Sequence, residues 1–137
     1  MVKKIAVLLL AVLVVSGCVE MGNNDIYDER QEEAEYRRIT PEQAKEMLDT
    51  DADIILLDVR TEEEFEQVRI PGAVLLPDVM IADSAFELLP DKESVILVYC
   101  RSGRRSENAA KELISMGYMN VYDFGGIIDW TFETESG

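Results

Sequence analysis

Hydrophobic and polar positions alternate in short blocks along the chain, and these blocks predict alternating strands and helices. Thr40 and Thr61 each have the pattern of a helix N-cap, because glutamine or glutamate follows three residues later. Strands are predicted at 54–57 and 94–99, where the apolar runs 54–57 and 95–99 are continuous, as in strands that are covered on both faces. Further short strands are predicted at 73–76 and 121–122, and further helices at 82–89 and 105–116. This alternation predicts an α/β fold with a mainly parallel sheet flanked by helices.

The first eighteen residues have the pattern of an export signal. Two lysines precede an unbroken apolar run from residue 5 to residue 15, and small residues follow. A run of eleven residues is shorter than the roughly 20 that a membrane-spanning helix needs, so residues 1–17 are interpreted as a cleaved signal peptide. The segment 15–18 resembles a prokaryotic lipobox, and the resemblance implies that Cys18 is lipidated. An ordinary signal peptide followed by an unrelated cysteine is the alternative.

Residues 18–38 are expected to be a lipid-anchored N-terminus followed by an acidic linker. From residue 19 onward the segment is polar and dense in charge, with no sustained apolar face. The folded domain is therefore expected over residues 39–137. Together with Cys18 this predicts an exported protein that is held at the outer face of a cell membrane by its lipid.

Composition excludes several function classes. A chain of 137 residues is long enough for one ordinary domain. It has no histidine, which excludes Ser-His-Asp and Cys-His catalytic pairs and every histidine-based metal site. The net charge of -15 repels nucleic acid, so nucleic acid is not an expected partner. No cofactor and no metal are expected, because no motif for either is present.

The candidate chemistry is concentrated at Cys100, which directly follows the predicted strand 94–99. Three arginines lie within the next six residues of an otherwise acidic chain. A loop that turns from a strand into a helix can direct backbone N–H groups at one point, where an anion binds and a thiol pKa is lowered. Cys100 is therefore the predicted nucleophile, and a buried structural thiol is the alternative. The predicted substrate-binding residues are Arg101, Ser102, Gly103, Arg104 and Arg105.

Five segments with this order and spacing resemble a single rhodanese domain. They are 57–60 (Leu-Asp-Val-Arg), 64–65 (Glu-Phe), 70–73 (Ile-Pro-Gly-Ala), 100–106 (Cys-Arg-Ser-Gly-Arg-Arg-Ser) and Gly125-Gly126-Ile127 with Trp130. The resemblance covers about residues 38 to 132 and implies a sheet of about five parallel strands. It also implies that Cys100 accepts sulfane sulfur from a small anionic donor such as thiosulfate. The resulting persulfide would pass its sulfur to a thiol or to cyanide.

Loop length separates the reactions that the resemblance allows. In this family a six-residue loop accompanies sulfur transfer, whereas a seven-residue loop accompanies phosphatase or arsenate reductase activity. Residues 100–105 make a six-residue loop, and position 106 is serine where the phosphatase pattern has arginine. A sulfurtransferase is therefore predicted, with Arg105 as the main ligand of the substrate's oxyanion. A persulfide carrier without rapid turnover is the alternative, and a phosphatase or arsenate reductase is a weaker one.

Three further motif positions are interpreted as structural. Asp58 and Arg60 are assigned to a scaffold ion pair, Trp130 to the core, and Gly125-Gly126 to a tight turn.

Overall fold

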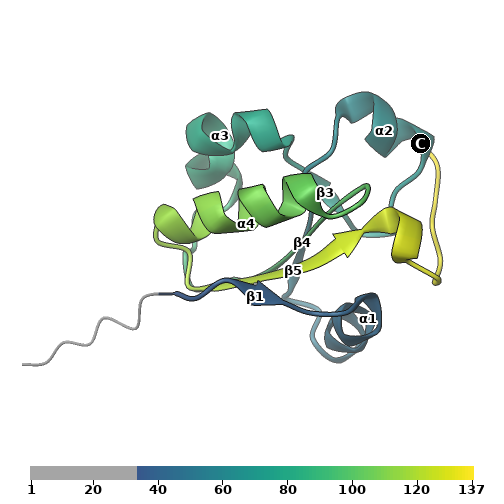
Figure 1. The fold of residues 1–137 in the computed structure, drawn as a ribbon, viewed down its shortest axis with the longest axis horizontal. Coiled ribbons are helices and arrows are strands. Elements are labelled where there is room, and N and C mark those ends of the chain that lie inside the picture. Colours follow the sequence, from purple (N-terminus) through teal and green to yellow (C-terminus); the bar gives the residue numbers. More distant parts are fainter. Residues whose placement is uncertain (1–33) are drawn as a thin grey trace, which may run out of the picture. The chain divides into compact units, whose positions relative to one another are not determined.

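Five parallel strands form the central sheet of the described part of the chain, residues 34–137 of a computed structural model (Figure 1). Their order across the sheet is β1-β5-β4-β2-β3, and every neighbouring pair is parallel. The strands are β1 (Arg37–Arg38), β2 (Ile55–Asp58), β3 (Val74–Leu75), β4 (Val95–Cys100) and β5 (Asn120–Gly126). The predicted α/β fold with a five-stranded parallel sheet is confirmed.

Helices cover both faces of this sheet. They are α1 (Pro41–Thr50), α2 (Glu62–Gln67), α3 (Ile81–Leu88) and α4 (Arg104–Ser115), with short 3-10 turns at Asp78–Met80 and Ile127–Asp129. Figure 1 shows α3 and α4 on one face and α1 on the other. Each face has its own apolar core, one containing Leu113 of α4 and the other containing Ala44 of α1. Both predicted N-caps are present, since Thr40 and Thr61 form complete capping boxes.

The central strand β4 delivers Cys100 to the carboxyl edge of the sheet. It lies between β2 and β5, and Ile96 through Cys100 are all buried. A strand with neighbours on both sides and helices on both faces needs an apolar sequence, which explains the continuous run. Because parallel strands all end at the same edge, the residues that follow β2, β3 and β4 meet there.

The first strand, β1, lies within residues 18–38, the segment that is expected to hold the linker. Arg37 and Arg38, which were assigned to the linker, pair with Tyr122 and Asp123 of β5. The backbone N–H of Ile39 continues this pairing by donating to Asp123 O at 2.9 Å. Two consecutive arginines give no apolar signal, and their place in the sheet depends on a partner strand more than eighty residues away. The last strand is likewise longer than the predicted 121–122.

The proposed signal peptide and Cys18 lie outside the described residues. Within residues 34–137, no helix has the length and apolar character that crossing a membrane requires.

Candidate active site

Cys100 lies at the end of β4, under the loop that begins α4. The sheet register pairs Cys100 with Gly126 of β5, and only 1% of the cysteine is exposed. The backbone N–H of Gly103 donates a hydrogen bond to Cys100 Sγ at 3.0 Å. Gly103 has a φ of 110°, a conformation that glycine adopts with little strain, and α4 begins at the next residue. The loop thus folds back over its own cysteine.

Hydrogen-bond donors lower the pKa of the Cys100 thiol. Burial acts to raise this pKa, but hydrogen bonds from Ser106 and from the backbone N–H groups of Gly103 and Ser102 outweigh it. All of these donors are uncharged groups of the loop and of the first turn of α4. Ser106 was not among the predicted site residues, although it directly follows them in sequence.

The Ser106 hydroxyl has several possible acceptors and only one proton. Besides the thiol it lies 3.1 Å from Gly103 O and 3.2 Å from Gly125 O. It can therefore donate to only one of these groups at a time. The backbone N–H groups are the more constant part of the thiolate's environment, because their direction is set by the fold.

Two glycines at the end of β5 form the surface on which the loop rests. A Cβ on Gly126 would lie 2.0 Å from the carbonyl oxygen of Arg101, so no side chain fits there. The same oxygen accepts a hydrogen bond from Ile128 N at 3.2 Å. Gly125 has a φ of 91°. The glycine pair thus belongs to β5 and supports the cysteine loop, in place of the isolated tight turn that was expected.

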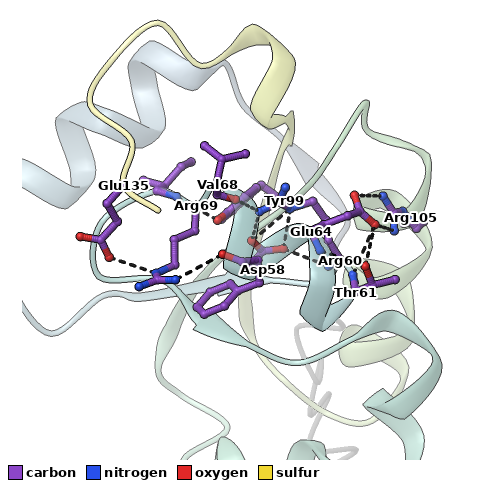
Figure 2. Close-up of polar contacts among 11 residues, drawn as sticks. Asp58, Arg60, Thr61, Glu64, Val68, Arg69, Tyr99, Arg105 and Glu135 are labelled. Atoms are coloured by element: carbon purple, nitrogen blue, oxygen red, sulfur yellow. Dashed lines mark hydrogen bonds and ion pairs between the residues drawn. The ribbon is translucent and has the colours of Figure 1, made fainter. Parts of the chain in front are cut away.

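The guanidinium group of Arg105 is only partly exposed to solvent. It donates to both carboxylate oxygens of Glu64, with Nη1–Oε1 at 2.7 Å and Nη2–Oε2 at 2.9 Å (Figure 2). Hydrogen bonding from Arg105 is the main reason that the pKa of Glu64 falls to about 2. The substrate-binding role of Arg105 remains a prediction, and the structure adds Glu64 as a competitor for the same fork.

The other two arginines of the loop are exposed. Within residues 34–137, neither Arg101 nor Arg104 forms an ion pair. Arg101 lines a cleft of about 430 Å³ beside the loop. The cleft therefore combines the guanidinium group of Arg101, which has no ion-pair partner within residues 34–137, with apolar side chains, and this combination suits a small anion and an organic acceptor. Its remaining lining residues are Arg60, Glu64, Gln67, Val68, Ile127 and Ile128.

Arg60, which lines this cleft, forms a buried ion pair with Asp58 (Figure 2). The side chain of Asp58 is 0% exposed and that of Arg60 is 3% exposed, and Arg60 Nη2 lies 2.6 Å from Asp58 Oδ2. The same nitrogen donates to Val68 O at 2.6 Å. The pair thus joins the end of β2 to the turn after α2, as a scaffold pair would. Within the described residues, no three acidic or thiol side chains lie close enough together to hold a metal ion.

The central strand of this α/β domain ends in a cysteine that is surrounded by hydrogen-bond donors. This arrangement suits covalent chemistry on sulfur. A family model for the rhodanese-like domain matches residues 40–133. The chain therefore belongs to the rhodanese family.

Individual relatives agree with this assignment. The chain is 36% identical over 73 residues to the thiosulfate sulfurtransferase PspE of Escherichia coli, covering 53% of this chain and 70% of that protein. It is 37% identical over 101 residues to the putative sulfurtransferase YtwF of Bacillus subtilis, covering 74% and 96%. A solved structure described as a rhodanese with anions from E. coli superposes with a TM-score of 0.58 at 32% identity, over 61% of this chain and 99% of that one. Two longer relatives are matched over only 24% and 52% of their length.

Proposed function

We propose that the protein is a sulfurtransferase that carries sulfane sulfur as a persulfide on Cys100, with thiosulfate or a related anion as donor. The observation that carries the proposal is the cradle of N–H and O–H donors around Cys100 Sγ. These donors stabilise negative charge on sulfur. The thiolate is the form of the cysteine that attacks a sulfane sulfur, and the persulfide is also anionic before it transfers its sulfur. Similarity to the thiosulfate sulfurtransferase PspE supports thiosulfate as the donor.

The reaction proceeds in two displacements. In the first, the Cys100 thiolate attacks the outer sulfur of thiosulfate, a sulfur–sulfur bond to Cys100 forms, and sulfite leaves with the electron pair of the bond that breaks. In the second, cyanide or a thiolate attacks the terminal sulfur of the persulfide, and the electron pair returns to Cys100 as thiolate. Neither step needs a general base when the thiol is already ionised, which agrees with a chain that has no histidine.

Arg101 is the first contact for the donor in this proposal. It lines the cleft beside the loop and has no ion-pair partner in the described part of the chain, whereas the fork of Arg105 is occupied by Glu64. Arg101→Ala is therefore expected to raise the KM for thiosulfate by a larger factor than it lowers kcat. It is also expected to raise this KM more than Arg105→Lys does. This order reverses the one that sequence alone suggests. An unchanged KM in Arg101→Ala would return the donor contact to Arg105.

Steady-state turnover separates enzyme, carrier and phosphatase. The purified protein should convert thiosulfate and cyanide to sulfite and thiocyanate over many cycles, and Cys100→Ser should abolish this conversion without unfolding the protein. One sulfur accepted per molecule, followed by slow release, would favour the carrier alternative. Hydrolysis of a phosphate ester or reduction of arsenate without sulfur transfer would contradict the proposal.

We also propose that the protein is exported and anchored by lipid on Cys18. The support is the order of lysines, apolar run and small residues in the first eighteen positions. A diacylglycerol supplies the two chains that stable anchoring requires. Expressed in a bacterial host, the wild type should partition into detergent and Cys18→Ala should not. Release of the wild type as an unlipidated protein would contradict the anchor.

A further inference from the structure

A second buried carboxylate, Asp123 of β5, lies on the opposite side of β4 from Asp58. It is fully buried, and both of its oxygens accept hydrogen bonds. Oδ2 accepts from Tyr36 OH at 2.7 Å and from Arg38 Nη1 at 2.8 Å, and Oδ1 accepts from Gly125 N at 2.8 Å. A carboxylate without these partners would be costly at this depth, so the three donors and Asp123 form one unit.

Arg38 extends this unit to the loop itself. A Cβ on Gly125 would lie 2.5 Å from Arg38 Nη2, and a Cβ on Gly103 would lie 3.2 Å from the same nitrogen. The guanidinium group therefore occupies the space that the two missing side chains leave. Both glycines have a positive φ and lack a Cβ that would restrict their backbone, so the packed guanidinium group is the neighbour that limits their movement on this side.

The same two glycines contact the groups that surround the thiol. Gly103 N donates to Cys100 Sγ, and Gly125 O lies within hydrogen-bond distance of the Ser106 hydroxyl. A shift of either peptide would change the direction of a donor that stabilises the thiolate. Arg38 thus lies two contacts from the sulfur, although it comes from β1, ahead of the residues 40–133 that the family model matches.

We propose that Arg38 and Asp123 are positioning residues for the Cys100 thiolate, acting through the backbone of Gly103 and Gly125. Neither residue touches the sulfur, so neither is a catalytic residue. The proposal rests on the proposed function, because a thiolate that loses its hydrogen-bond donors would be a poorer nucleophile for sulfane sulfur.

Other charged groups around the loop must stay unchanged in any test. They are Arg101 and Arg104 of the loop, Arg105 of α4 paired with Glu64 of α2, Asp78 of the 3-10 turn after β3, and the buried Asp58–Arg60 pair. Substitution on β1 leaves all of them in place. Arg37 offers a matched control, since it is the neighbouring arginine of the same strand and contacts Tyr122 on the exposed side.

The test is the rate of Cys100 alkylation as a function of pH in the purified protein. Arg38→Ala is expected to raise the apparent pKa of Cys100 by about half to one unit, the loss of a fraction of one hydrogen bond to a charged group. Arg37→Ala should leave this pKa unchanged. Tyr36→Phe removes one donor to Asp123 with little change of shape, and should raise the pKa by less than Arg38→Ala does.

Two results would overturn the proposal: a folded Arg38→Ala protein with the wild-type pKa, or an equal rise in Arg37→Ala. If Arg38→Ala fails to fold, the comparison of Tyr36→Phe with Arg37→Ala decides in the same way. Alkylation involves no sulfur transfer, so the result holds whether or not thiosulfate proves to be the donor. Failure of the proposed function would instead show as wild-type protein that alkylates normally and never forms a persulfide.

Discussion

Two arginine–carboxylate pairs, Asp58–Arg60 and Glu64–Arg105, lie near each other at the carboxyl edge of the sheet (Figure 2), and they differ in burial. The side chains of Asp58 and Arg60 are 0% and 3% exposed, whereas those of Glu64 and Arg105 are 25% and 30% exposed. The first pair is enclosed by backbone groups that complete its hydrogen bonding. The second is open on the side of the cleft. The same type of ion pair therefore supports the scaffold where it is buried and remains accessible to a ligand where it is partly exposed.

Breaking the buried pair should have the largest effect on stability. Asp58→Ala leaves the Arg60 guanidinium buried without its counter-ion, which is expected to cost about 3–5 kcal/mol in the free energy of unfolding. Urea unfolding of the purified variant measures this loss. Glu64→Ala is the matched control, because it breaks the partly exposed pair, and it should cost clearly less. Equal losses in the two variants would mean that burial does not separate the pairs.

Breaking the partly exposed pair should have a smaller effect that depends on pH. The pKa of Glu64 is lowered from its ordinary value of about 4.5 to about 2, so the pair stabilises the folded state fully above pH 4.5 and loses that contribution as pH falls through 2. Wild type should therefore be more stable than Glu64→Gln near neutral pH. The difference should shrink between about pH 4.5 and pH 2 in unfolding curves. A difference that stays constant down to pH 2 would show that Glu64 does not gain its stability from the ionised pair.

Neither pair is expected to be the main cause of the lowered pKa of Cys100. Ser106→Ala removes an uncharged donor and should raise this pKa by about one unit, because a hydrogen bond to a charged group contributes roughly 1.5–3 kcal/mol when fully formed and this hydroxyl is shared. Ser102→Ala is the control, since it keeps the backbone N–H that faces the thiol. The pH profile of alkylation provides the measurement. A larger rise in Glu64→Gln than in Ser106→Ala would assign the effect to charge.

Salt should have the smallest effect and should act over longer distances than either pair. The chain carries a net charge of -15, which repels an anionic donor before it reaches the loop. Moderate salt screens this repulsion more than the short contacts inside the cleft, so kcat/KM for thiosulfate should rise modestly. A steady fall from the lowest salt concentration would instead show that attraction by the exposed Arg101 and Arg104 dominates the approach.

The parts of the fold that sequence predicts well are those with local signals. The threonine N-caps of α1 and α2 and the apolar run of β4 each depend on a few neighbouring residues, and all three are present in the structure. The position of Cys100 after a buried strand follows from the same run. The positive φ of Gly103 has no such local signal and is seen only in the structure.

The contacts that sequence did not reveal join residues far apart in the chain. Arg105 faces Glu64, forty-one positions earlier, and Arg38 faces Asp123, eighty-five positions later. In the sequence, the capping box of α2 already accounts for Glu64. Arg37 and Arg38, which precede α1, have the pattern of a polar linker. Such partners become visible only when parallel strands bring their carboxyl ends to one edge.

Mass measurement of the protein before and after incubation with thiosulfate tests the central claim most directly. We predict a gain of one sulfur atom, located on Cys100 by fragmentation, which is lost again on addition of cyanide. Cys100→Ser should show no gain under the same conditions. Wild-type protein that is folded, with its thiol free to be alkylated, and that never gains sulfur from thiosulfate or any other sulfane donor would contradict the assignment of Cys100 as a sulfur carrier.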